Sequence, residues 1–216
     1  MKELYVKKVS LANIPVASVP ALLDQEKVAF QPIDTVNWKA YPYCPAVEFR
    51  MAYADKALLL HFRVKEASVR AVAPHDDASV WEDACVEFFS IPAGDGVYYN
   101  LECNCAGTIL IGAGKERGNR QRAPQEVLDK VLRWTSLGRE PFEERIGECA
   151  WEVALIVPFE AFFLHNLQSL DGKTIRANFY KCGDKLQKPH FLSWNPIEIE
   201  KPDFHRPDFF GELHLE

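Results

Sequence analysis

Alternation of apolar and polar side chains over Val97–Cys105 restricts the fold of this chain more than any other feature. Successive side chains of a β-strand point to opposite faces of its sheet. The odd positions of this run therefore share a mostly apolar face. The even positions share a polar face that contains Tyr98, Asn100, Glu102 and Asn104. The pattern predicts a half-buried strand with one face toward a core.

The same period of two recurs in other short runs. Val47–Tyr53 and Leu58–Lys65 form the clearest predicted hairpin, because a short turn segment joins two alternating runs. Further strands are predicted over Cys149–Val157, Thr174–Lys181 and Phe191–Trp194.

Helical spacing is confined to residues 124–134 and to a Pro-initiated turn over residues 158–163. Many short strands with little helix predict an all-β fold, an antiparallel β-sandwich of the jelly-roll type with one or two short helices. Residues 1–25 read as an extended lead-in along the sheet edge. We expect a single domain over residues 1–216, because no repeat, linker or low-complexity segment interrupts the chain.

Charge and hydropathy argue against several classes of partner. The net charge is −6, and no basic stripe is present to bind nucleic acid. No apolar run is long enough to span a membrane. Met1–Lys8 lacks the apolar segment of a secretory signal. We therefore expect a cytoplasmic protein whose six cysteines are reduced.

A large aromatic residue and several acids stand together in Val80–Ser90. If the chain is extended from Trp81 onward, then Trp81, Asp83, Cys85 and Glu87 share one face of the strand. A sugar offers apolar C–H faces and a rim of hydroxyl groups, which an aromatic plate beside carboxylates can match. We therefore predict a site for a mono- or oligosaccharide here. The alternative role of Trp81 is core packing.

Polar faces of two other predicted strands add to this site. Asn100 and Glu102 lie on one of them, and Asn178 and Tyr180 lie on the other. All four side chains carry planar hydrogen-bonding groups, which suit sugar hydroxyls. A sheet face that simply meets solvent has the same pattern, so both interpretations remain open.

Catalysis is the alternative to binding. Asp83, Glu87 and Glu102 can supply the acid pair of a glycoside hydrolase acting on O-glycosyl bonds. However, the chain has no Gly-x-Ser-x-Gly elbow and no His-Glu-x-x-His motif, and its histidines are scattered. We expect binding without catalysis, with hydrolysis as the competing hypothesis.

Metal and cofactor signals are sparse. His75-Asp76-Asp77 can contribute oxygen ligands to a structural calcium ion, although a calcium site draws on several segments. Cys103 and Cys105 share a strand face and can form half of a metal site or serve as small core residues. Haem is a third possibility, and Met1 and Met51 are the only thioether ligands available to it.

Three segments together carry a resemblance to a known family. They are Trp81–Phe89, Tyr98-Tyr99 with the strand that follows, and the ending Asp203–Leu213 with its Pro-x-x-Phe-Gly-x-Leu pattern. In order and spacing the chain resembles family 9 carbohydrate-binding modules, the β-sandwich modules attached to some xylanases, and related stand-alone domains. The resemblance covers roughly residues 45–216. It implies carbohydrate binding linked to glycoside hydrolases, xylan and carbohydrate catabolism.

The family holds the end of a sugar between two aromatic rings and contains structural calcium. The resemblance implies that Trp81 is the first ring and that Glu87 is the carboxylate that binds hydroxyl groups. Asn178 or Tyr180 falls near a position that hydrogen-bonds the sugar. Glu102 occupies a position where the family can place a basic residue.

The second ring of the clamp is expected seven residues before Gly211. That residue is Phe204 in this chain, in place of the expected tryptophan. Trp194 is the alternative second ring.

Overall fold

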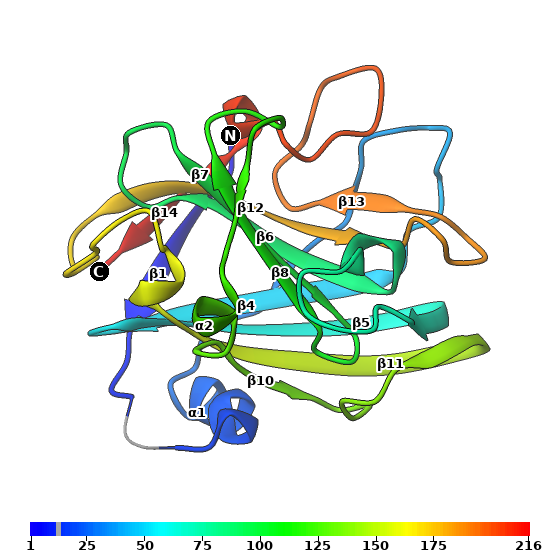
Figure 1. Cartoon of the computed structure of the whole chain (residues 1–216), viewed down its shortest axis with the longest axis horizontal. Helices are drawn as coiled ribbons and strands as arrows, with labels where there is room; N and C mark the ends of the chain where they lie inside the picture. Colours follow the sequence, from blue (N-terminus) through cyan, green and yellow to red (C-terminus); the bar gives the residue numbers. More distant parts are fainter. Residues whose placement is uncertain (12–13) are drawn as a thin grey trace.

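Strand β1 (Glu3–Lys8) joins the two layers of the protein, whose computed structural model describes residues 1–11 and 14–216. The first part of β1 pairs in parallel with β14 (Gly211–Leu215), and its end pairs in parallel with β4 (Ala46–Ala54). The other strand pairs found in the described residues are antiparallel. The result is one curled 14-stranded sheet that folds over on itself (Figure 1).

The remaining strands divide between the two layers. The β4 layer also contains β2 (Gln31–Pro32), β5 (Ala57–Ala71), β10 (Leu132–Thr135) and β11 (Phe142–Pro158). The β14 layer also contains β3 (Thr35–Val36), β6 (Cys85–Ile91), β7 (Tyr98–Asn104), β8 (Ile109–Gly114), β9 (Gln121–Arg122), β12 (Thr174–Cys182) and β13 (Phe191–Ser193).

Helical structure is limited to short pieces. The α-helices are α1 (Val19–Gln25) and α2 (Gln125–Leu128). The 3-10 turns are η1 (Val16–Ser18), η2 (Val80–Glu82), η3 (Phe159–Ala161) and η4 (Pro207–Phe209). No helix in residues 1–11 and 14–216 has the length and apolar character needed to cross a bilayer.

The predicted fold class is confirmed, since the described residues form two strand layers with two short α-helices. The parallel pairing of β1 differs from a purely antiparallel sandwich. Parallel strands need a long connection between them, and residues 9–45 provide one between β1 and β4. The partner of β1 in the other layer, β14, lies at the opposite end of the sequence.

The main core fills the space between the layers and is rich in aromatic rings. Phe49 of β4 stacks on Phe179 of β12 with ring centroids 3.6 Å apart, and Phe88 of β6 lies 5.0 Å from Phe179. Tyr99 and Leu101 of β7 also belong to this core. The apolar faces predicted for these strands from alternation are the faces that pack here.

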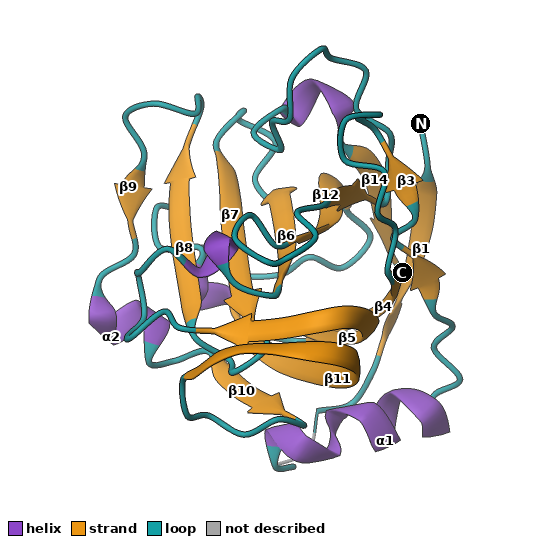
Figure 2. Ribbon diagram, turned by 90° about the vertical axis from the view of Figure 1, so that its right-hand side faces the viewer, coloured by secondary structure: helices purple, strands orange, loops and turns teal. Residues whose placement is uncertain are grey.

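The outer face of the β4 layer is covered by α1 (Figure 2). Val19 and Leu23, four positions apart on one side of the helix, are fully buried against it. Arg50 of β4 ties the helix down, because its guanidinium donates to the Asp24 carboxylate at 2.6 Å and to the Pro20 carbonyl at 2.8 Å. The extended lead-in expected for residues 1–25 is therefore wrong for α1, while its residues 12–13 lie outside the described part of the chain.

The outer face of the β14 layer is covered by residues 194–210, which we call the covering segment. Its side chains Ile197, Phe204 and Phe210 are buried in a second cluster with Phe89 and Tyr98. The solvent-facing sheet considered from the sequence is thus largely enclosed. One hollow remains between the covering segment and the strands.

The helix predicted over residues 124–134 is shorter than expected. Only Gln125–Leu128 is α-helical, and Leu132–Thr135 forms β10, paired with β11. Pairing with a neighbouring strand overrides helical spacing here, because a strand gains a full ladder of backbone hydrogen bonds.

Candidate functional site

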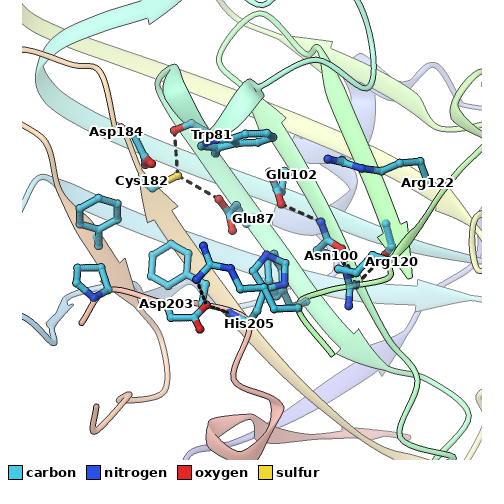
Figure 3. A pocket seen from close by; sticks show the side chains of 16 residues that line it. Trp81, Glu87, Asn100, Glu102, Arg120, Arg122, Cys182, Asp184, Asp203 and His205 are labelled. Atoms are coloured by element: carbon cyan, nitrogen blue, oxygen red, sulfur yellow. Dashed lines mark hydrogen bonds and ion pairs between the residues drawn. The ribbon is translucent and has the colours of Figure 1, made fainter. Parts of the chain in front are cut away.

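A cavity of about 340 Å³ lies on the outer face of β6 and β7, between the covering segment and the loop that joins β8 to β9 (Figure 3). Its lining is mixed in charge and contains aromatic, acidic and basic side chains. The lining residues are Trp81, Glu87, Phe89, Asn100, Glu102, Gly112, Arg117, Arg120, Arg122, Cys182, Asp184, Phe191, Pro202, Asp203, Phe204 and His205.

Trp81 reaches the pocket from the 3-10 turn η2, not from a strand. The strand predicted from Trp81 begins only at Cys85. The Trp81 carbonyl accepts a hydrogen bond from the Asp184 backbone N–H (3.2 Å) and lies 3.5 Å from the Cys182 sulfur. These contacts hold the turn against the end of β12, so the half-buried indole is fixed at the pocket edge.

Asp83 does not line the pocket, contrary to the predicted shared face. Its carboxylate is fully buried and accepts hydrogen bonds from the backbone N–H groups of Val72 and Ala73, both at 3.0 Å. Asn104 donates a third bond at 2.9 Å. The turn η2 rotates Asp83 away from the face that carries Glu87. Asp83 therefore anchors a loop. It does not reach the cavity, so it cannot be one of the two acids of a hydrolytic site there.

Glu87 and Glu102 stand directly opposite each other on β6 and β7, and both are buried. Burial raises the pKa of Glu87 well above its usual value, and the nearby Cys182 and Glu102 raise it further. Burial also raises the pKa of Glu102 to about 7, although a hydrogen bond from Asn100 (2.9 Å) opposes the shift. Two like charges this close do not ionise together readily, so the pair can donate as well as accept hydrogen bonds. We call Glu87, Asn100 and Glu102 the pocket floor.

Arg120 fastens the loop between β8 and β9 to the pocket floor. Its guanidinium lies 3.9 Å from the centroid of the Tyr98 ring and donates to Asn100 Oδ1 from Nη2 at 2.6 Å and from Nε at 3.0 Å. Gly112 makes this contact possible, because a Cβ at that position would lie 2.7 Å from Asn100 Oδ1. The side chain thereby orients Asn100, whose amide then donates to Glu102.

Residues 203–205 of the covering segment form the opposite side of the pocket. Figure 3 shows Asp203 and His205 across the floor from Trp81. His205 Nδ1 lies 3.0 Å from the Tyr98 hydroxyl, and burial followed by the nearby Arg120 lowers the pKa of His205 to about 4. Arg117 reaches over from the β8–β9 loop to within 3.3 Å of Asp203. This exposed pair links the two loops above the pocket.

Phe204 lines the pocket and is supported from behind by Tyr180. The two rings stack with centroids 4.2 Å apart and an interplanar angle of 6°. The Tyr180 hydroxyl donates to the Phe204 carbonyl at 3.2 Å. Tyr180 therefore lies beneath the ring that meets the cavity and does not line the cavity itself.

Two other predicted sugar-binding residues also lie outside the pocket. Asn178 donates to the Asn195 carbonyl at 3.0 Å and accepts from the Asn195 backbone N–H at 2.8 Å, which fixes the covering segment to β12. Trp194 is buried in the main core against Phe49 and Phe179. With its faces covered by protein, the Trp194 ring cannot stack on a ligand.

The loop at His75-Asp76-Asp77 does not fit a calcium ion. Arg133 donates to both carboxylate oxygens of Asp76, at 2.7 and 2.8 Å, and Arg122 lies 3.3 Å from Asp77. A hard cation needs six to eight oxygen ligands, whereas these oxygens already face guanidinium groups. The haem hypothesis gains no ligand from Met51, which is buried in the main core.

Several lining residues were not singled out from the sequence. They are Arg117, Arg120, Arg122, Asp203 and His205. Only their places in the sequence could have indicated them. Asp203 and His205 flank Phe204, and the three arginines lie in or just after the Gly-rich segment that follows an alternating strand. Spacing alone does not reveal that both loops close over the same strands.

One family model and several solved structures match this chain over nearly its whole length. The model of the family described as carbohydrate-binding family 9 matches residues 17–215. A crystal structure of a Bacteroides uniformis protein, to which carbohydrate binding is ascribed, superposes with a TM-score of 0.97 and 59% identity, covering 100% of this chain and 99% of that one. No curated protein matches the chain.

A family 9 module from Caldicellulosiruptor kristjanssonii has the same fold. Its structure in complex with glucose gives a TM-score of 0.59 at 12% identity, covering 100% of this chain and 96% of that one. Its structure in complex with cellotriose gives a TM-score of 0.62 at 13% identity, covering 100% and 94%.

Proposed function

Because the chain belongs to carbohydrate-binding family 9, we propose that it binds the end of a mono- or oligosaccharide without cleaving it. One observation carries the proposal. Trp81 and Phe204 line the same cavity as the facing carboxyl groups of Glu87 and Glu102. This is the combination of apolar plates and planar hydrogen-bonding groups that a pyranose requires.

Each part of the pocket suits one part of a sugar. The C–H face of a pyranose would pack on the Trp81 indole and on the Phe204 ring, which removes apolar surface from water. Glu87 and Glu102 would hydrogen-bond neighbouring hydroxyl groups, with Asn100 held ready by Arg120. A volume of about 340 Å³ lies at the lower end of the roughly 300–1,000 Å³ range of ligand pockets, which favours a terminal sugar unit.

The choice of sugars to test follows from the relatives. Because related modules are solved with glucose and cellotriose, we propose that β-linked glucose oligomers bind here, with xylan fragments as the next class. A role in carbohydrate catabolism beside glycoside hydrolases is part of the same proposal.

Calorimetric titration with glucose, cellotriose and xylotriose tests the proposal. We expect saturable binding by the wild type and at least a roughly tenfold loss in Trp81→Ala, because a buried aromatic anchor usually dominates a small interface. Trp134→Ala is the matched control, since Trp134 is also half-buried but lies on β10, away from the cavity. Absence of binding across a wider glycan panel, or equal affinity of Trp81→Ala and wild type, would refute the proposal.

Glycoside hydrolysis is the second candidate, and it rests on the paired acids. Glu87 and Glu102 face each other in the pocket, and burial raises the pKa of both carboxyl groups, as an acid catalyst requires. This candidate predicts release of the aglycone from an aryl glycoside and its loss in Glu87→Gln. Non-catalytic binding predicts no turnover by either protein, with weaker sugar affinity in Glu87→Gln.

A further inference from the structure

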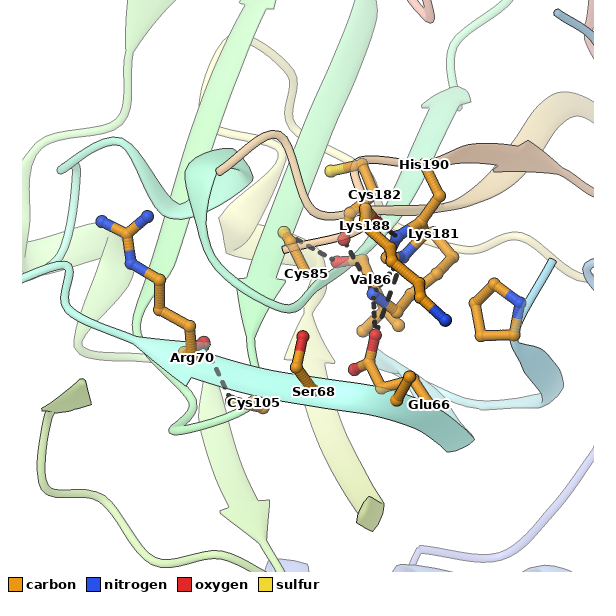
Figure 4. Close-up of polar contacts among 12 residues, drawn as sticks. Glu66, Ser68, Arg70, Cys85, Val86, Cys105, Lys181, Cys182, Lys188 and His190 are labelled. Atoms are coloured by element: carbon orange, nitrogen blue, oxygen red, sulfur yellow. Dashed lines mark hydrogen bonds and ion pairs between the residues drawn. The ribbon is translucent and has the colours of Figure 1, made fainter. Parts of the chain in front are cut away.

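Two thiols and a carboxylate converge at the inner end of the pocket floor. Cys85 of β6 and Cys182 of β12 are directly opposite each other in the antiparallel ladder, and Glu87 follows on the same face as Cys85. One ligand atom from each of Cys85, Glu87 and Cys182 lies within 4.8 Å of the other two. The Cys182 thiol already donates to Glu87 Oε1 at 3.0 Å. Figure 4 shows the two thiols on the same side of the neighbouring strands.

The three groups are buried in the protein, and two of them line the cavity. Cys85, Glu87 and Cys182 are each at most 3% exposed, while Glu87 and Cys182 line the pocket. Rigid strands on either side hold the ligand atoms, so little ordering would accompany binding. A set of three protein ligands at the edge of a cavity is the arrangement of metal sites that keep one coordination position free.

The surroundings also favour a cation. Glu102 faces Glu87 across the ladder, and its buried Oε2 atom has no hydrogen-bond partner among the described residues. Asp184 lines the same end of the pocket. Lys181, the nearest lysine in sequence, points to the other face of β12 and pairs with Glu66 at 2.9 Å. Acidic groups thus gather at the thiol pair, while the arginines of the same pocket contact other groups: Arg117 pairs with Asp203, Arg120 donates to Asn100 and Arg122 lies 3.3 Å from Asp77.

We propose that Cys85, Cys182 and Glu87 bind a soft divalent metal ion of the zinc type, with a fourth position open to the pocket. Thiolate ligands select zinc over calcium and magnesium, which prefer oxygen. On binding, the two thiols and the Glu87 carboxyl group release their protons to solvent, and their sulfur and oxygen atoms coordinate the ion, so no oxidant or reductant is needed. Because Glu87 belongs to both sites, an ion would take a carboxylate that otherwise faces the sugar.

Other cysteines provide the controls for this site. Cys103 and Cys105 lie on the opposite face of their strand, in the main core. Cys44 is exposed and Cys149 is partly exposed, so both can bind added metal without any built site. The experiment therefore starts from the double variant Cys44→Ser/Cys149→Ser, which keeps the proposed ligands and removes the accessible thiols.

Anaerobic titration of this double variant with Co²⁺, after removal of reductant, tests the proposal. We expect thiolate-to-cobalt charge-transfer absorption that saturates at about one equivalent and is lost when Zn²⁺ is added but retained when Ca²⁺ is added. Adding Cys182→Ser or Cys85→Ser should abolish most of this absorption, and Glu87→Gln should weaken binding roughly tenfold or more. Adding Cys105→Ser should leave the absorption unchanged.

Two results would overturn the metal site: no charge-transfer absorption in the double variant, or absorption that persists after Cys182→Ser. Near-ultraviolet circular dichroism of each variant shows whether the core is still packed. Sugar titrations of the metal-free double variant are independent of this outcome. Failure of the metal site therefore does not count against the proposed carbohydrate binding, and failure of sugar binding does not count against the metal site.

Discussion

Two groups of buried ionisable residues lie on opposite sides of the β14 layer, and they differ in the charges that they bring together. Glu66, Lys181 and His190, which we call the buried cluster, lie on the core side. The pocket floor lies on the outer side, where Glu87 and Glu102 pair across β6 and β7. Both groups are almost completely removed from solvent. They differ in whether the protein itself supplies partners of opposite charge.

The buried cluster pairs opposite charges within the chain (Figure 4). Lys181 Nζ lies 2.9 Å from Glu66 Oε2 and donates to His190 Nε2 at 2.8 Å. Trp151 Nε1 donates to Glu66 Oε1 at 2.7 Å. Burial and the charge of Lys181 lower the pKa of His190 to about 2, so the neutral ring accepts at Nε2 and donates from Nδ1 to the Lys188 carbonyl. Every charge finds its partner within the chain.

The pocket floor, by contrast, places like groups together. Glu87 and Glu102 repel each other when ionised, and their hydrogen-bond partners Cys182 and Asn100 are neutral. Arg122 and Arg120 lower the pKa of Glu102, but no ion pair to either carboxyl group is found among the described residues. Charges buried with complementary partners hold the layers in place, whereas acids buried beside one another destabilise the ionised state. We infer that the buried cluster stabilises the fold, whereas the pocket floor is arranged to bind a ligand.

Lys181→Met would break the buried cluster and have the largest effect. Removal of the ammonium leaves Glu66 as an uncompensated buried charge, so we expect a loss of about 3–5 kcal/mol in the free energy of unfolding. Urea denaturation measures it. The double variant Lys181→Met/Glu66→Gln keeps an acceptor for Trp151 and should recover most of the loss. A single variant within about 1 kcal/mol of wild type would show that the cluster is not structural.

Glu102→Gln would remove one ionisable group from the pocket floor, and its effect on the free energy of unfolding should depend on pH. The pKa of Glu102 is about 7 in the folded protein, against an ordinary value of 4.5. Its neutral form contributes stability that is fully present below about pH 4.5 and is lost as pH rises through 7. We therefore expect equal stability of variant and wild type at low pH and a more stable variant at pH 8, by on the order of 3 kcal/mol.

The measurement for Glu102 is the difference between variant and wild type in urea denaturation across this pH range, since buried histidines affect both proteins alike. Glu198→Gln, at an exposed position, is the control and should follow the wild type at every pH. A Glu102→Gln variant that is less stable than wild type at pH 8 would mean that the floor is held together like the buried cluster.

Arg117→Ala would test the pocket rim and should have the smallest effect. Arg117 pairs with Asp203 at 3.3 Å, but its side chain is 67% exposed, so water and salt screen the interaction. We expect a loss of at most about 1 kcal/mol in the free energy of unfolding, and less in high salt. Denaturation curves at low and high sodium chloride concentration measure both. A loss above about 2 kcal/mol that does not depend on salt would mean that this pair stabilises the fold as the buried cluster does.

Much of the strand framework was predictable because local alternation specifies which residues form strands. The hairpin of β4 and β5, the strand β7 and the alternating faces of β12 follow the predicted pattern. The predictions failed where the chain turns: η2 interrupts the run that begins at Trp81, and α1 replaces an extended lead-in. Turns and short helices depend on contacts with distant segments, which periodicity does not report.

The candidate site was predictable only in part for the same reason. Glu87, Asn100 and Glu102 line the pocket because their strand positions determine their face. Trp194, Asn178 and Tyr180 do not, since the covering segment and the main core enclose them. Whether a polar strand face meets solvent, a ligand or another segment is decided by how a distant loop returns across the sheet.

The sequence by itself determined the class of fold and the two faces of its strands, because side-chain alternation is a local consequence of extended backbone geometry. Only the tertiary structure decided that residues 194–210 cover the β14 layer, that Phe204 lines the same cavity as Trp81, and that Cys85 lies opposite Cys182 beside Glu87. Those contacts join residues far apart in the chain. Their formation depends on the summed packing of both layers, which no local pattern records.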